Sequence, residues 1–99
     1  MGWGSIDGGN ETSWQGRSGL FFWLLEKIAY SAESENVRRL AREYADASVR
    51  WLDLTELSPP EHDEVIGLLR TMSEVGRREL PVDYHHLTLP SLEELKNLE

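Results

Sequence analysis

The chain has 99 residues, of which 39% are hydrophobic and 28% are charged, a composition typical of folded globular proteins. Two separate hydrophobic cores would leave about 50 residues each, too few without disulfides or metals, so we expect a single domain over residues 1–99. Ten Lys and Arg residues against eighteen Asp and Glu residues give a net charge of −8. This charge disfavours binding to nucleic acid or to an anionic membrane, and it favours a basic protein partner.

Residue types exclude several classes of site. The chain has no cysteine, which excludes disulfides, thiolate nucleophiles and cysteine-ligated metals. The longest apolar run, residues 19–25, is far shorter than the ~20 residues that a membrane helix needs. Residues 1–16 contain no Lys or Arg, unlike a secretory signal, so a bacterial-type cytoplasm is the expected location. No catalytic motif is present, and we expect no cofactor.

The first 17 residues are predicted to form an irregular arm. Six of the eight glycines lie within the first 19 residues, among polar residues, and such a stretch loses much backbone entropy in regular structure. The arm also contains Trp3, Ile6 and Trp14, whose burial is favourable. We therefore expect the arm to dock at least partly on the rest of the chain.

Two helices are predicted between residues 18 and 50. Apolar residues recur at three- and four-residue spacing from Leu20 to Ala32, and again from Val37 to Ser48. One continuous helix would bury opposite faces at its two ends. A turn near residues 31–36, with Ser34 as the N-cap of the second helix, allows both helices to face one core as an antiparallel pair.

Residues 51–57 are ambiguous between a helix extension and a short strand, and we interpret them as a connector. Ser58 and Glu61 have the spacing of a capping box, with prolines between them, and predict the start of a third helix that continues to Gly76. Pro81 and Pro90 bracket a segment, residues 82–89, that is predicted to be extended.

Residues 91–94 repeat the capping-box pattern and predict a short C-terminal helix, although Leu98 and Glu99 can instead belong to a cloning scar. The expected fold class is all-α: a small three- to four-helix bundle over residues 18–98, with the irregular arm packed against the first helix.

The predicted first helix carries more aromatic surface than one buried stripe needs. Phe22, Trp23 and Tyr30 project away from its apolar stripe. Two interpretations remain open: Trp3 and Trp14 cover these side chains as a second small core, or the face binds a partner.

Acidic residues concentrate between residues 53 and 64. Negative charge at a helix N-terminus is favoured by the helix dipole, but five carboxylates exceed that need and suit a cationic partner. Trp23 and Trp51 are the predicted aromatic anchors. The full predicted partner-binding set is Trp23, Tyr30, Trp51, Asp53, Glu56, Asp63 and Glu64.

Basic residues cluster at Arg38, Arg39 and Arg42, but acidic residues stand at helical pair spacing around them, including Glu43 and Asp46. We therefore interpret this stretch as a solvated, ion-paired helix face.

Three histidines, His62, His85 and His86, permit a metal-site hypothesis, but their spacing is poor. In an extended segment His85 and His86 would point to opposite sides, and His62 falls on the inner stripe of the third helix. A small metal- or ligand-binding enzyme using these histidines and Glu26 is kept as an alternative.

The favoured hypothesis is a non-enzymatic, acidic protein-binding module, most concretely an immunity- or antitoxin-type inhibitor of a basic protein. A second alternative is a homo-oligomeric structural module that pairs through the aromatic face of the first helix. For the favoured hypothesis we expect a monomer or a weak homodimer.

Overall fold

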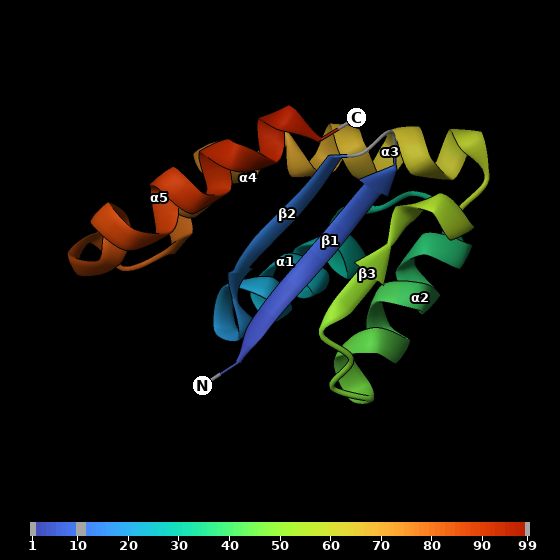
Figure 1. The fold of residues 1–99 in the computed structure, drawn as a ribbon, viewed down its shortest axis with the longest axis horizontal. Coiled ribbons are helices and arrows are strands. Elements are labelled where there is room, and N and C mark those ends of the chain that lie inside the picture. The colour runs from blue at the N-terminus through green and yellow to red at the C-terminus, as the bar shows by residue number, and fades with distance from the viewer. Residues whose placement is uncertain (1, 10–11, 99) are drawn as a thin grey trace.

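The computed structural model describes residues 2–9 and 12–98, and in this part of the chain it shows a mixed α/β fold. The described residues form five α-helices and a three-stranded sheet (Figure 1). The expected all-α bundle is therefore wrong, because the stretch interpreted as an irregular arm forms two strands and residues 51–53 add a third.

The sheet joins the beginning of the chain to its middle. Strands β1 (Trp3–Gly9) and β2 (Thr12–Arg17) pair antiparallel, and β3 (Trp51–Asp53) pairs parallel with β1, giving the order β2-β1-β3. Ile6 lies opposite Trp14 on β2 and Leu52 on β3, and all three side chains are buried. The arm therefore docks, as expected, but it does so as strands whose alternate residues point to one core.

Glycines on the buried side of the hairpin allow it to lie close to its neighbours. A Cβ added at Gly4 would lie 2.8 Å from Cδ1 of Phe21, a distance at which one of the two groups must shift. A Cβ at Gly16 would lie 2.6 Å from Cζ2 of Trp14. The glycines that suggested irregular structure are therefore small residues on the inner face of a sheet.

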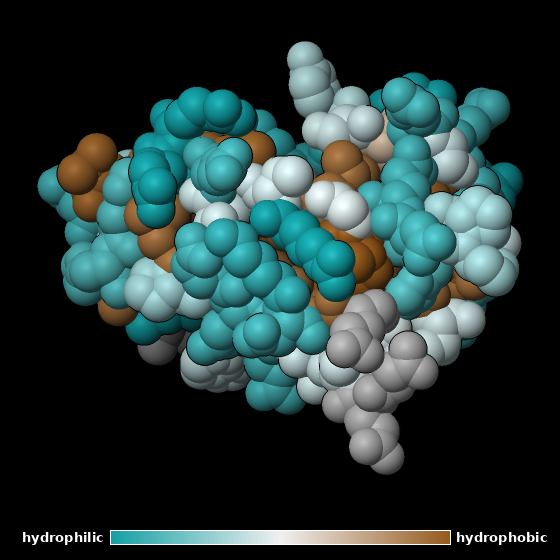
Figure 2. All heavy atoms as spheres, turned by 90° about the horizontal axis from the view of Figure 1, so that it is seen from above, coloured by the Kyte–Doolittle hydropathy of each residue, from teal (hydrophilic) through white to brown (hydrophobic). Residues whose placement is uncertain are grey.

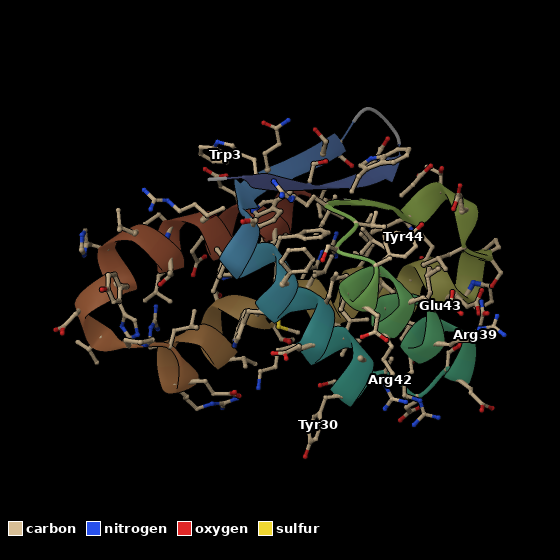
Figure 3. The ribbon with its side chains drawn as sticks, turned by 90° about the horizontal axis from the view of Figure 1, so that it is seen from below. Trp3, Tyr30, Arg39, Arg42, Glu43 and Tyr44 are labelled. Atoms are coloured by element: carbon tan, nitrogen blue, oxygen red, sulfur yellow. The ribbon has the colours of Figure 1, made fainter. Side chains whose placement is uncertain are left out.

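Helices α1 (Ser18–Ser31) and α2 (Glu35–Asp46) confirm the two helices predicted from periodicity. Ser34 caps α2 as predicted, its Oγ accepting a hydrogen bond of 3.4 Å from the Val37 N–H. The two helices pack against each other and lie on one side of the sheet (Figure 3). Their buried side chains include Leu24, Ile28 and Val37.

The predicted third helix begins as expected and then breaks. A short 3₁₀ turn, η1 (Leu54–Glu56), leads into α3 (Pro59–Leu69), and the Glu61 carboxylate accepts the Ser58 N–H at 3.2 Å, as a capping box requires. The helical path is interrupted at residues 70–71 and resumes as α4 (Met72–Glu79). Gly76 on α4 allows α5 to approach, since a Cβ there would lie 2.5 Å from Cδ1 of Leu92.

The segment expected to be extended is helical instead. It forms a 3₁₀ turn, η2 (Val82–Tyr84), and then α5 (His85–Glu93), followed by η3 (Glu94–Asn97). Pro90 lies inside α5, where it removes one backbone hydrogen bond. The burial of Leu92 and Leu95 compensates for this loss and fixes the segment on the core.

The C-terminal helices are tied to the sheet and to α3. The Trp14 Nε1–H donates a 2.7 Å hydrogen bond to the Ser91 carbonyl. Ser91 was predicted to begin a helix, but it lies in the interior of α5. Leu98 is buried and its carbonyl accepts a hydrogen bond from Arg70 at 3.0 Å, while Glu99 lies outside the described residues. Helices α4 and α5 extend together toward one end of the molecule (Figure 1).

Replacement of two glycines by alanine is predicted to have opposite effects on stability, because Gly4 lies at the close contact between β1 and α1 whereas Gly67 lies in open space. Gly4→Ala should lower the free energy of unfolding by about 1–3 kcal/mol, because the new methyl group displaces Phe21. Gly67→Ala, in the exposed interior of α3 with no atom within 4 Å of the new methyl group, should raise it by about 0.5–1 kcal/mol. Urea unfolding of both variants tests this; equal effects would contradict the packing described.

Candidate protein-binding site

One face of the sheet is not covered by the helices. Buried residues alternate along β1 and β2 with residues that point to the other side, as strand geometry requires. We name this side the open sheet face. It carries Trp3, Ser5 and Asp7 from β1, Ser13, Gln15 and Arg17 from β2, and Trp51 and Asp53 from β3.

Two tryptophans are largely exposed on the open sheet face. Trp3 is 65% exposed and Trp51 is 53% exposed, although an indole usually gains by burial. Figure 3 shows Trp3 on the side of the sheet away from the helices. Trp51 was predicted as a partner anchor. One of the two open interpretations had Trp3 cover the aromatic side chains of the first helix, and the exposure of Trp3 speaks against it.

Two carboxylates lie side by side next to Trp51. Asp7 and Asp53 are register partners on adjacent parallel strands and point to the same face. Each is held by a local hydrogen bond: Asp7 Oδ1 accepts the Gly9 N–H at 3.1 Å, and Asp53 Oδ1 accepts the Thr55 N–H at 2.9 Å. Like charges at facing positions of adjacent strands are generally unfavourable, so a cation placed between them is expected to bind favourably.

A shallow hollow of about 300 Å³ lies beside Trp51 on the same face. Asp7, Ser13 and Gln15 line it together with the indole. An aromatic ring beside a carboxylate suits the side chain of lysine or arginine, which can contact the ring and pair with the carboxylate. The volume of the hollow is at the lower end of the about 300–1,000 Å³ that is usual for ligand sites, and the hollow is open, so we expect it to take one side chain of a partner.

Further acidic residues surround the same end of the sheet. Burial raises the pKa of Tyr44, and the negative charges of Glu56, Asp53 and Glu43 raise it further, which places these carboxylates around one ring (Figure 3). Glu56 is exposed on η1, which packs against β1. The predicted acidic residues Asp53 and Glu56 are thus brought together.

Asp63 belongs to the same region. Its side chain is 86% exposed and one oxygen lies 3.8 Å from Nδ1 of His62. The other ring nitrogen of His62 lies 2.7 Å from the carbonyl oxygen of Gly8, at the end of β1. Asp63 therefore lies near the sheet end that carries Asp7.

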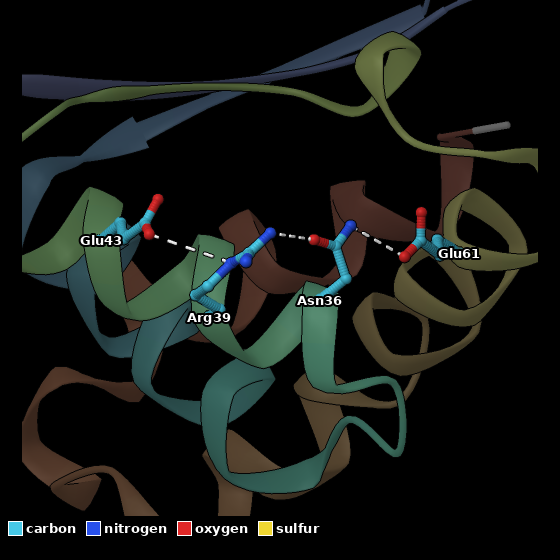
Figure 4. A network of polar contacts seen from close by, with 4 residues as sticks. All are labelled: Asn36, Arg39, Glu43 and Glu61. Atoms are coloured by element: carbon cyan, nitrogen blue, oxygen red, sulfur yellow. Dashed lines mark hydrogen bonds and ion pairs between the residues drawn. The ribbon is translucent and has the colours of Figure 1, made fainter.

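Glu64 and Glu61 have structural roles. Glu64 Oε2 accepts the Glu33 N–H at 2.9 Å, and Glu61 Oε2 accepts a 2.9 Å hydrogen bond from the Asn36 side chain (Figure 4). Both bonds hold the α1–α2 turn against α3. Glu64, which was predicted as a partner contact, is thus committed to the fold, and hydrogen bonds from Asn36 and then Ser58 lower the pKa of Glu61.

The arginine-rich face of α2 is partly paired. Arg39 donates to the Asn36 side chain at 2.6 Å and lies 3.9 Å from Glu43 (Figure 4). Of the helical pairs expected around these arginines, this is the one ion pair found in the described part of the chain.

Seen from above, the molecular surface is mainly hydrophilic, with narrow apolar strips between polar side chains (Figure 2).

The aromatic residues of α1 do not form a single exposed face. Trp23 is half-buried, and Lys27 Nζ lies 5.8 Å from its ring centroid while also pairing with Glu79. Tyr30 is 87% exposed and projects from the end of α1 (Figure 3). Neither lies on the open sheet face, so the structure separates these two predicted partner contacts from Trp51.

The three histidines do not converge. His62 lies at the start of α3, whereas His85 and His86 lie at the start of α5, at the other end of the molecule (Figure 1). A ring nitrogen of His85 lies 2.9 Å from the Leu80 carbonyl oxygen. Across residues 2–9 and 12–98, no group of three or more His, Asp or Glu side chains has the arrangement of a metal site.

Comparisons with protein-family models, with curated proteins and with solved structures give no match to this chain. No helix among the described residues has the length and apolar character needed to cross a membrane. Sequence reasoning missed Asp7 and the exposure of Trp3, although the alternation of residues 3–8 was the available signal.

The lowered pKa of Glu61 predicts a specific pH dependence. A carboxyl whose pKa is lower in the folded state stabilises the fold above its unfolded pKa, and this contribution is lost as pH falls through the folded pKa. Glu61→Gln should therefore show a shallower loss of stability than the parent on acidification. Urea unfolding from neutral to acidic pH measures the difference; parallel curves for the two proteins would show that Glu61 is not responsible.

Proposed function

We propose that this protein is a non-enzymatic, acidic protein-binding module that takes a basic protein as its partner. An inhibitor of the immunity or antitoxin type, acting in the cytoplasm, is the most concrete form of the proposal. The interface is the open sheet face, with Trp51 as the aromatic anchor and Asp7 and Asp53 as the principal charges. Glu56 and Asp63 extend the acidic region at its edge.

The observation that carries the proposal is the pair of carboxylates in register beside an exposed indole. Like charges at facing positions of adjacent strands are generally unfavourable, and among the described residues neither carboxylate forms an ion pair. A lysine or arginine from a partner would relieve the repulsion and contact Trp51 at the same time. The partner's charge is thus matched to a specific place on the surface.

The net charge of −8 supports the same partner class. Long-range attraction accelerates the encounter of oppositely charged proteins, and a buried aromatic anchor then slows dissociation. The two effects depend on different residues and can be separated by mutation.

Asp7→Asn with Asp53→Asn is expected to weaken partner binding while leaving the fold intact or slightly stabilised. Asparagine can still accept the local hydrogen bonds from Gly9 and Thr55, so only the charge is lost. Relief of repulsion should raise the free energy of unfolding by about 0.2–1 kcal/mol. A double variant that is clearly less stable, or that binds the partner as tightly as the parent, would contradict the assigned role.

Trp51→Ala should weaken capture of the partner. The immobilised protein is expected to retain a basic protein from its native lysate in a one-to-one molar ratio, and moderate salt should release it. The free energy of binding to the Trp51→Ala variant should be weaker by about 2 kcal/mol. Tyr30→Ala is the matched control, since it also removes an exposed aromatic ring but lies away from the open sheet face. Equal capture by both variants would exclude Trp51 as the anchor.

A further inference from the structure

The outer edge of β2 has backbone groups that are free to bind another strand. The Ser18 N–H donates to the Gly2 carbonyl at 3.0 Å, on the side of β1 that faces β2. The Ser5 N–H donates to the Arg50 carbonyl at 2.9 Å, on the side of β1 that faces β3. These two bonds determine which residues of β1 and β2 are hydrogen-bonded to each other in the antiparallel ladder. Gly16 therefore bonds toward β1, while the Gln15 N–H and C=O and the Arg17 N–H point outward. Among the described residues, none bonds to these outward groups.

The sequence of this edge carries little of the proline and charge that usually protect a sheet edge. Its sequence contains no proline and a single charged residue, Arg17, and the strand is six residues long. An exposed row of unpaired N–H and C=O groups is a template for the addition of an extended chain.

A groove lies directly beside the edge. It has a volume of about 760 Å³, within the range of about 300–1,000 Å³ that is usual for ligand sites. Its lining includes Gln15 and Arg17 of β2, Trp3 of β1, Leu20 of α1, and Leu87, Ser91 and Glu94 of the C-terminal helices. We name this region the edge groove. Leu87 is 46% exposed there and provides an apolar contact for a ligand side chain.

The geometry of the edge groove restricts what it can take. Its outer wall, α5, is tied to β2 by the 2.7 Å hydrogen bond from Trp14 to the Ser91 carbonyl. Because α5 stands beside β2, we expect a single extended chain to meet less obstruction at this edge than the sheet of a second copy of this protein. The ligand is therefore a single extended segment.

The charges of the edge groove indicate the composition of that segment. Glu94 lies at the end where β2 packs against η3, and Arg17 lies at the end where α1 begins. A basic side chain in the ligand would pair with Glu94, and an apolar side chain would lie between Leu20 and Leu87. Because side chains alternate along a strand, the basic and the apolar side chain of the ligand both face the helices when they are two positions apart.

We propose that the edge groove binds an extended peptide segment of another protein, which adds as a fourth strand to β2 and carries an apolar and a basic side chain two positions apart. This inference rests on the proposed protein-binding function, because the ligand is a polypeptide in both cases. The principal groups differ: the backbone of β2 and the side chains of α5 bind the ligand here, whereas Trp51 and the two aspartates bind it on the open sheet face. Gln15 lines both places.

The test is selection of displayed random linear peptides against the whole protein, followed by affinity measurement of the selected peptides. We expect the selected sequences to share the apolar and basic pair. Gln15→Pro removes an outward N–H without removing a β1–β2 hydrogen bond, and should weaken binding about tenfold or more. Gln15→Thr also replaces the side chain that lines the groove but keeps the N–H, so it is the matched control, and affinity should fall much less than for Gln15→Pro.

Two further variants make the result independent of any folding defect in Gln15→Pro. Leu87→Asp changes an exposed side chain and should also weaken peptide binding about tenfold. Glu94→Lys should change the selected sequences from basic to acidic at the paired position. Circular dichroism of each variant confirms that the fold is retained.

The proposal is overturned if no peptide is enriched, or if the selected peptides bind Gln15→Pro, Leu87→Asp and the parent equally well. It is also overturned if light scattering shows a dimer that Gln15→Pro disrupts, since the edge would then pair with a second copy. Trp51→Ala separates this proposal from the proposed function: peptides should bind that variant normally even where capture of a basic partner is weakened.

Discussion

The packing of a glycine-lined strand pair onto α1 is the interaction on which the other features depend. Gly4 lies against the ring of Phe21, and Gly16 lies against the indole of Trp14, at distances that exclude a larger residue. Ile6 and Leu52 fill the space between the strands and the helices. Because small and large residues alternate on one side of the hairpin, the sheet approaches the helices closely and buries one face completely.

The same packing determines which groups remain available. Burial of one face commits the other face to solvent, and the order β2-β1-β3 leaves β2 at an edge. The carboxylates then fall into two groups. Glu61 and Glu64 hold the α1–α2 turn against α3, whereas Asp7 and Asp53 lie in register on the open sheet face, and each accepts a hydrogen bond from the residue two positions further along the chain. We therefore place the proposed interface at the second pair.

The sequence predicted the helices better than the sheet, for physical reasons. The periodicity of α1 and α2, the cap at Ser34 and the capping box at Ser58 are local signals, and the structure confirms them. The hairpin was missed because glycine has low strand propensity, and its role here depends on contacts with Phe21 that are distant in the sequence. Helix α5 was missed because Pro90 opposes it locally, while burial of Leu92 favours it through tertiary contacts.

The candidate site was predicted in part. Trp51 and Asp53 were selected from their residue types, and β3 places them on the open sheet face. Asp7 could be found only with the parallel pairing of β1 and β3, which links segments more than forty positions apart. The edge groove required tertiary structure for the same reason, since β2 and α5 are separated by most of the chain.

Residue-resolved amide hydrogen exchange tests the central claim most directly. If the hairpin packs on α1 with β2 at a free edge, the amides of Trp14 and Gly16 should exchange slowly, and those of Gln15 and Arg17 should exchange rapidly. The amides of Ser5 and Asp7 on the central strand should also be protected, because they point toward β3. Uniformly fast exchange over both strands, or strong protection of Gln15 and Arg17, would contradict this account.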